Sequence, residues 1–351
     1  MRVLLTGATG LVGSHLCRAL LAQGETVRVF RRPSSSLRLL DGLDVEHAVG
    51  DLTEPESIEA AMQGVDVVYH AAGVASSQST AGRMYTVMVE GTRSVLQAAL
   101  EAGVQRVVFT SCVMALGVPE PASTRRGQPV LLNEHHTWNF RGDRWPIGYT
   151  KYMAEMEVQK AVARGLDVVT VNPGFIIGAQ DIHRQTHSLV VQIARQKLPF
   201  LISGGFNFVH VMDVVDGHLA AMRSGRCGER YILGGENLSY IAFARKVGEI
   251  AGVNPPLLVL PGGVAGRLVG PLNFLQRFIN LPVGVETLNI AGQLFFYDNR
   301  KARTELGLKA PRPIELAIKE ALDWHRQGEQ PKPDAAGEGE QAEAQNEQRE
   351  S

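Results

Sequence analysis

Three glycines near the start of the chain have the spacing of a phosphate-binding turn. The stretch TGATGLVG places Gly7, Gly10 and Gly13 between a β-rich apolar run and a stretch with helical periodicity. Gly7 would make the turn, Gly10 would let the backbone approach a pyrophosphate, and Gly13 would let helix and strand pack closely. The helix N-terminus would face the phosphate charge. The predicted binding residues of this loop are Gly7, Thr9, Gly10, Leu11, Val12 and Gly13. A tight turn without a ligand is the alternative.

Two arginines follow the second predicted strand, where the ribose of a dinucleotide is usually read. An Asp or Glu at this point binds the ribose 2′-OH. Here the strand ends in VFRRPSSS, so that Arg31 and Arg32 offer guanidinium groups instead. Guanidinium groups suit a 2′-phosphate, which favours NADP, with NAD possible. The alternative is that both arginines are solvated surface residues.

The elements that must position these residues alternate along the chain. Buried strand-like runs such as RVLLT, TVRVF, VDVVYH and VQRVVFT alternate with amphipathic helical stretches. This alternation predicts right-handed βαβ units and a parallel sheet. The predicted fold class is therefore α/β, a Rossmann-type doubly wound parallel sheet with a smaller C-terminal α/β substrate-binding region.

The same pattern predicts a division of the chain into parts. Residues 1–177 would form the dinucleotide-binding domain, and residues 205–235 would rejoin it. Residues 178–204 and 236–326 would form the substrate-binding region. Residues 327–351 have no large apolar side chain and an acidic excess, so a disordered tail is expected there.

Composition excludes several classes of protein. The net charge is −1, which argues against nucleic-acid binding. The three cysteines are far apart, so neither a disulfide framework nor a metal site is expected, and a reducing cytoplasm fits best. The spacing of His183 and His187 lacks a third metal ligand. No signal peptide is indicated, and no run reaches the ~18 apolar residues of a membrane span. Residues 257–296 predict core or pocket-lining helices, with a membrane-surface segment as the alternative.

The sequence resembles the extended short-chain dehydrogenase/reductases, in their NAD(P)-dependent epimerase/dehydratase branch. The motifs that carry the resemblance include TGATGLVGSHL, VGDLTEPES, VVYHAAG, YTKYMAE, VNPGFIIG and YDNRKARTELGL, and they cover about residues 1–326. It is similar to dihydroflavonol-reductase-like and hopanoid-associated sugar-epimerase-like members. The resemblance implies an oxidoreductase or epimerase of small molecules and a homodimer formed by two helices, within residues 84–100 and 152–164. A monomer is the alternative.

The resemblance also implies further binding residues. One pair would lie by the adenine, one turn would line the cofactor path after the fourth strand, and one segment would border the nicotinamide. These residues are Asp51 and Leu52, then Ala71, Ala72 and Gly73, then Pro173, Gly174, Phe175 and Ile176. Ordinary strand-end turns are the alternative for the first two groups.

The expected proton relay is altered. Family members place a Tyr four residues before a Lys on one helix face, and a Ser or Thr after the fifth strand. Here Lys151 remains, but the Tyr position is Ile147 and the Ser position is Cys112. A third position, usually Asn, is Met88. Three replacements around one site suggest that the standard Tyr-based proton transfer is absent.

Other acids near Lys151 are candidates for the missing role. Tyr149 lies two residues away, roughly 200° around a helix, and would serve only from a flexible entry loop. His135, His136 and Asp143 precede the helix, although solvated loop positions are the alternative for each. The predicted catalytic residues are Lys151, Cys112 and Tyr149.

Two functions from different classes follow. The first is an NAD(P)-dependent oxidoreductase or epimerase that acts on a carbonyl or carbinol of a small organic or sugar-nucleotide substrate. The alternative is a catalytically silent NADP(H)-binding sensor or scaffold, in which the binding residues stay and the relay has drifted. A thiol-dependent role for Cys112 beside the cofactor is a third hypothesis, although a cysteine at such a position is usually inert.

Overall fold

A parallel sheet forms the centre of the computed structural model, which describes residues 1–74, 80–120, 124–125, 128–182, 189–256, 258–264 and 288–329. Among these residues, seven strands pair side by side, and every pairing is parallel. In sheet order they are β12 (Arg230–Leu233), β8 (Val168–Pro173), β5 (Arg106–Thr110), β4 (Val67–His70), β1 (Arg2–Thr6), β2 (Thr26–Arg31) and β3 (Glu46–Val49). The strand order reverses between β1 and β4, which creates a switch point at the carboxyl ends.

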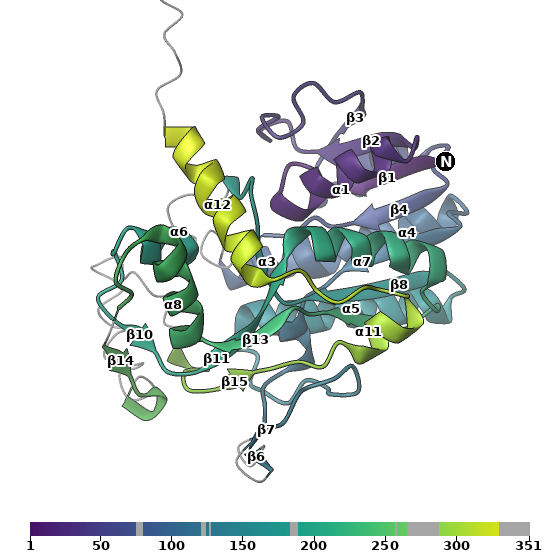
Figure 1. Ribbon diagram of the computed structural model, residues 1–351. Helices are drawn as coiled ribbons and strands as arrows, with labels where there is room; N and C mark the ends of the chain where they lie inside the picture. Colours follow the sequence, from purple (N-terminus) through teal and green to yellow (C-terminus); the bar gives the residue numbers. More distant parts are fainter. Residues whose placement is uncertain are drawn as a thin grey trace, which may run out of the picture.

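Helices cover both faces of this sheet (Figure 1). On one face lie α1 (Leu11–Ala22) and α7 (Val211–Ser224), in an apolar cluster that includes Leu16, Val29 and Val215. On the other face lie α2 (Pro55–Met62), α4 (Gly91–Glu101) and α5 (Pro146–Ala163), in a cluster that includes Ile58, Leu96 and Val158. The prediction of a doubly wound α/β fold is confirmed.

A second sheet of four strands lies beside the first, among the described residues. Strand β11 (Gly205–His210) pairs with β9 (Phe175–Ile177), β13 (Glu236–Ser239) and β15 (Leu294–Phe295). Two further elements, α8 (Tyr240–Ala251) and α12 (Ile314–Glu329), pack with these strands around buried rings such as Phe208 and Phe243. This is the smaller region that follows the parallel sheet.

The remaining elements are short. They are α3 (Ala81–Tyr85), the π-helix η2 (Thr86–Glu90), the 3₁₀-helix η3 (Val113–Leu116), β6 (Thr124–Arg125), β7 (Gln128–Pro129), α6 (Leu189–Ala194), β10 (Leu201–Ile202), β14 (Val259–Leu260) and α11 (Arg300–Glu305). No helix among the described residues has both the length and the apolar character needed to cross a bilayer.

The path of residues 205–235 differs in part from the expectation. Within this range β12 joins the parallel sheet and α7 packs against it, but β11 lies in the second sheet. The reason is pairing, because the chain leaves the parallel sheet after β8, and the next strand, β9, takes β11 as its parallel neighbour. The division into domains stays a prediction. The acidic tail lies outside the described residues from residue 330 onward, and residues 327–329 belong to α12.

Candidate active site

The glycine turn lies between β1 and α1, at the switch point of the sheet. Gly7 has φ +77°, and a Cβ there would lie 2.7 Å from the backbone of Ala71 and Ala72. A Cβ at Gly13 would lie 2.1 Å from the carbonyl oxygen of Gly7. Both glycines are therefore required by the fold itself, since real side chains do not approach backbone so closely.

Gly10 is different, because the fold does not demand a glycine there. It is the N-cap of α1 with φ −100°, and a Cβ would meet only the Gly7 oxygen, at 3.4 Å. The missing side chain instead leaves the helix N-terminus open, where backbone N–H groups favour a phosphate. The residues of this loop thus fit a dinucleotide pyrophosphate.

Hydrogen bonds of the buried His70 side chain connect the elements next to the glycine turn. His70 is fully buried at the end of β4, with Nδ1 2.7 Å from Thr6 Oγ1 and Nε2 3.0 Å from Thr92 Oγ1. Thr92 donates its proton to the Met88 carbonyl, and Thr6 accepts from the Ala72 N–H. Consistent donors and acceptors require Nε2–H on His70, which donates to Thr92 while Nδ1 accepts from Thr6. The network ties β1, β4 and η2 together, which is a packing role.

Lys151 points from α5 to the end of β5. Its ammonium Nζ donates to the Thr110 carbonyl at 3.0 Å, and a Cβ on Gly73 would lie 3.8 Å from it. Burial lowers the pKa of Lys151, whereas the nearby Cys112 raises it. Burial also raises the pKa of the Cys112 thiol, which keeps it protonated. Lys151, Cys112 and Gly73 are therefore brought together at the strand ends.

Ile147 and Met88 both lie next to Thr150, the residue before Lys151. Ile147 lies in the first turn of α5, directly after Pro146, and packs against the apolar cluster of the smaller region. Thr150 donates to the Ile147 carbonyl at 3.1 Å and contacts the Met88 sulfur at 3.9 Å. The first turn of α5 contains no acidic side chain.

Tyr149 lies within the helix and not in an entry loop. Its ring centroid is 5.7 Å from that of Trp138 and 6.4 Å from that of Tyr152. A Cβ on Gly142 would lie 2.7 Å from the Tyr149 ring, so the preceding loop packs tightly on it. The condition for recruiting Tyr149, a later helix start, is not met in this structure.

The three candidate general acids in the loop before α5, His135, His136 and Asp143, do not lie together. Asp143 forms an exposed ion pair with Arg141 at 2.8 Å, and His135 is exposed. His136 Nε2 lies 3.0 Å from the Val118 carbonyl oxygen, to which it donates. His183 and His187 lie outside the described residues. Within those that are described, no group of three His, Cys, Asp or Glu side chains could hold a metal ion.

The other expected binding residues lie around the carboxyl ends of the strands. Asp51 accepts from the N–H and hydroxyl of Thr53 at 3.0 and 2.9 Å, and Leu52 is buried below it. Arg31 donates to His47 Nδ1 at 3.3 Å, whereas Arg32 is exposed. Residues 71–73 follow β4, and residues 173–176 run from the end of β8 into β9.

One cluster was missed by reasoning from the sequence. The carboxylate of Glu155 is buried and accepts from Ser111 Oγ at 2.5 Å, Asn172 Nδ2 at 2.7 Å and Arg230 Nη1 at 3.0 Å. Asn172 also donates to the Cys112 carbonyl at 3.0 Å. The only signal in the sequence was an acid four residues after Lys151, on the same helix face. Its partners lie directly after β5, near the carboxyl end of β8 and at the first residue of β12.

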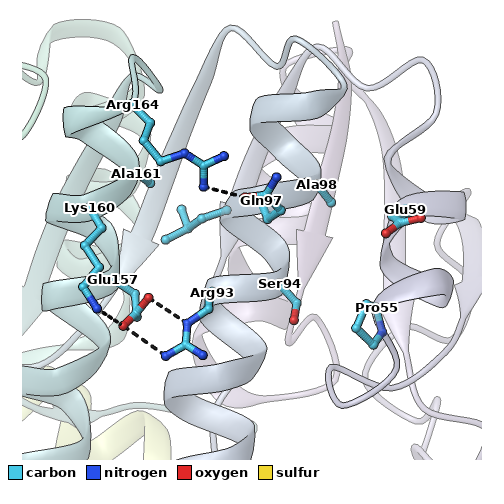
Figure 2. A pocket seen from close by; sticks show the side chains of 11 residues that line it. Pro55, Glu59, Arg93, Ser94, Gln97, Ala98, Glu157, Lys160, Ala161 and Arg164 are labelled. Carbon is cyan, nitrogen blue, oxygen red and sulfur yellow. Dashed lines mark hydrogen bonds and ion pairs between the residues drawn. The ribbon is translucent and has the colours of Figure 1, made fainter.

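A hollow of about 520 Å³ lies elsewhere, on the helix-covered face between α2, α4 and α5 (Figure 2). Arg93 and Lys160 each approach Glu157 at 2.8 Å, and Arg164 donates to Gln97 at 2.5 Å. Because its cations are already paired and it lies away from the strand ends, this hollow is not the place of the chemistry above.

A doubly wound parallel sheet with a glycine turn at its switch point defines a dinucleotide-binding α/β protein. The chain belongs to the NAD dependent epimerase/dehydratase family, whose model matches residues 3–234. The members of this family are NAD-dependent oxidoreductases, epimerases and dehydratases. The resemblance found in the sequence is confirmed.

Three similar proteins span nearly the whole chain. Sterol demethylase protein B of Methylococcus capsulatus is 36% identical over 93% of this chain and 99% of its own. A Synechocystis protein provisionally named dihydroflavonol 4-reductase is 33% identical over 91% and 93%. The crystal structure of gox2253 has a TM-score of 0.81 at 35% identity, covering 94% of this chain and 99% of that chain.

Substitution by alanine should affect cofactor binding at Gly10 and protein stability at Gly13. Gly10→Ala should weaken NADPH binding about tenfold or more, because the methyl group occupies the pyrophosphate approach. Its melting temperature should stay within about 2 °C of wild type. Gly13→Ala should destabilise the protein by about 1–3 kcal/mol or more through overpacking. Fluorescence titration and thermal melts measure both. Equal melting-temperature losses in the two variants would contradict this assignment.

Two buried histidines predict a loss of stability in mild acid. Burial lowers the pKa of His70 to about 3 and that of His218 to about 4. Unfolded histidine titrates near 6.5, so between pH ~6.5 and ~4 the unfolded chain binds more protons. The stability is present above this range and is lost as the pH falls, by about 2 kcal/mol for each histidine between pH 7 and pH 5.

Urea unfolding at pH 7 and pH 5 measures this loss. His218 donates from Nδ1 to the Val214 carbonyl and accepts from Thr110 Oγ1 at 2.8 Å. His218→Gln removes one titrating group, so the variant should lose about 2 kcal/mol less than wild type between the two pH values. An unchanged pH dependence in this variant would refute the role given to His218.

Proposed function

We propose that this chain is an NADP-preferring oxidoreductase or epimerase with an altered proton relay. It would act on a carbonyl or carbinol of a small organic or sugar-nucleotide substrate. The observation that carries the proposal is the position of Lys151, held at the Thr110 carbonyl beside Gly73, while Ile147 occupies the preceding helical turn. The proposed site thus has the lysine that would bind the cofactor but no tyrosine at the position of the usual general acid.

The residues present fit a dinucleotide along the carboxyl ends of the strands. The open N-terminus at Gly10 would hold the pyrophosphate, and Lys151 would donate to the nicotinamide ribose. When bound, the reduced cofactor supplies a hydride. Held at the Thr110 carbonyl, Lys151 would orient the ribose and, in its charged form, place positive charge near a developing oxyanion.

The site has no efficient side-chain donor for the proton that this oxyanion would need. Ile147 has no proton to give, and the Cys112 thiol is a weak donor whose pKa is raised by burial. Losing a general acid typically costs ~10²–10⁴-fold in rate. We therefore expect slow turnover, with water or a substrate group as proton donor.

The relatives suggest a direction for the substrate. The names of the similar proteins, Sterol demethylase protein B and dihydroflavonol 4-reductase, refer to sterols and to dihydroflavonols, which are multi-ring compounds. Ile147, one helical turn before Lys151, and Met88, which contacts Thr150, have apolar side chains that are compatible with a ring system of this kind. Sterols and flavonoids therefore belong in the first substrate panel, beside sugar nucleotides.

Catalytic silence is the second candidate function, and one observation favours it. Ile147, Cys112 and Met88 replace three polar positions of one site, while the glycine turn and Lys151 stay. Such a protein would bind NADP(H) as a sensor or scaffold. Tight NADPH binding without turnover on sugar nucleotides, flavonoids, sterols or aldehydes would favour it, and failure to bind either dinucleotide would reject both functions.

A homodimer through α4 and α5 remains part of the proposal. The outer face of these helices carries the Arg93–Glu157–Lys160 ion pairs, with Glu157 largely buried between them (Figure 2). Sedimentation of the purified protein decides between a dimer and the monomer.

The proposed cofactor preference predicts a selective effect of two arginines. NADPH should bind wild type about 10–100-fold more tightly than NADH, as expected for charged hydrogen bonds to a phosphate. Arg31→Ala with Arg32→Ala should remove most of this difference and leave NADH affinity nearly unchanged. Arg38→Ala is the matched control, because Arg38 instead lies 5.6 Å over the Trp324 ring. Equal affinities of wild type for the two cofactors would refute the preference.

Restoring the relay should raise turnover. Ile147→Tyr with Cys112→Ser returns a hydroxyl pair beside Lys151, and up to ~10²-fold faster NADPH oxidation is expected with a substrate that the wild type turns over slowly. Ile147→Phe with Cys112→Ser is the control, since it has the ring without the hydroxyl. No gain in the tyrosine variant, with NADPH binding retained, would count against a simple lost relay.

A further inference from the structure

A strained residue follows the strand that borders the expected nicotinamide site. Gln180 has φ +72°, a left-handed conformation that costs a non-glycine residue about 1–2 kcal/mol. It lies in the turn after β9, where Gly178 is already packed so tightly that a Cβ would lie 2.4 Å from Val211 Cγ1. A glycine would take this conformation freely, so the glutamine side chain must offset the strain.

The side chain of Gln180 is bound to helix α1. Its Oε1 accepts from Arg18 Nη1 at 3.0 Å and lies 3.4 Å from Ser14 Oγ. The neighbouring carbonyl of Ala179 accepts from His15 Nε2 at 3.1 Å. Three side chains of one helix therefore hold two adjacent residues of this turn. Helix α1 is the one whose N-terminus, at Gly10, forms the expected pyrophosphate site.

Arg18 makes a second connection from the same guanidinium group. Its Nη2 donates to the Leu39 carbonyl at 2.7 Å, in the segment that follows β2 and the two arginines expected to read the ribose. Arg18 also donates to the Ser14 carbonyl at 3.1 Å, which keeps it on the helix surface. One side chain thus joins segments at the two ends of the expected dinucleotide.

We propose that Gln180 is a positioning residue that fixes the turn after β9 on helix α1 through Arg18, so that the nicotinamide half of the cofactor is held in register with the adenosine half. This rests on the proposed dinucleotide site. Gln180 need not touch the cofactor. It acts through Arg18 and through the backbone that leads from residues 175–177.

Two probes separate the halves of the site. NADPH spans both, whereas 2′,5′-ADP carries the adenosine with its two phosphates and no nicotinamide. If wild type prefers NADH, NADH and AMP replace them. The variants are Gln180→Ala, which keeps the strain and removes the contact, Gln180→Gly, which removes both, and Gln180→Glu, which keeps an acceptor for Arg18. Arg18→Met tests the shared partner.

The expected pattern is selective. Gln180→Ala and Gln180→Gly should weaken NADPH about 3–10-fold, as expected for a lost hydrogen bond to a charged group, with 2′,5′-ADP affinity within about twofold of wild type. Gln180→Glu should stay within about twofold for both probes. Arg18→Met should weaken both probes, and adding Gln180→Ala to it should cost little more for NADPH.

Three outcomes would overturn the proposal. These are wild-type NADPH affinity in Gln180→Ala, equal losses for both probes in that variant, and a loss in Gln180→Glu as large as in Gln180→Ala. Hydrogen exchange of residues 178–182 should accelerate in the alanine variant while global melting stays near wild type. Failure of the wild type to bind any dinucleotide would instead reject the proposed function on which the inference rests.

Discussion

The burial of one carboxylate constrains the whole site. Glu155 is 4% exposed, and a buried charge is tolerated only when it is fully paired and hydrogen-bonded. Of its three donors, Ser111 directly follows β5, Asn172 lies near the carboxyl end of β8 and Arg230 is the first residue of β12. All three hydrogen bonds form only when these strands and α5 pack in one way. Lys151 lies one turn earlier on the same helix, so its place beside Gly73 follows from this requirement.

Ile147, Cys112 and Met88 carry no strong hydrogen-bonding side chain at the positions where the proposed proton relay was expected. Removing a buried hydrogen-bonding partner leaves the other partner unsatisfied, at a cost of about 1–3 kcal/mol. Ile147 packs against the apolar cluster of the smaller region and Met88 is buried, so neither side chain brings a buried polar group that would need a partner. Beneath the glycine turn, by contrast, the buried side chain of His70 is hydrogen-bonded to Thr6 and Thr92. This part of the site therefore depends on polar contacts, whereas the part around Ile147 depends on apolar packing.

The fold was largely predictable because its signals are local. Strand-forming runs, helix periodicity and the Gly7–Gly13 turn each depend on residues close in sequence, and together they predict the doubly wound sheet that is observed. The path of β11 was not predictable in this way. All six residues of β11 are buried. The sequence pattern of a fully buried strand does not indicate which of two sheets the strand will join. The partners of Glu155 were missed for the same reason, since they are 17 to 75 residues away.

The sequence by itself determined the glycine turn after the first strand and the presence of Lys151 with Ile147 four residues before it, because residue identity and short spacing decide what a group can donate or accept. Only the tertiary structure decided which groups meet. It placed Tyr149 against Trp138 and Tyr152, and it showed that Gly10, unlike Gly13, is free of internal contacts that would demand a glycine. It also joined Gln180 to Arg18 across 162 residues. Such contacts depend on how distant segments pack, which no local pattern records.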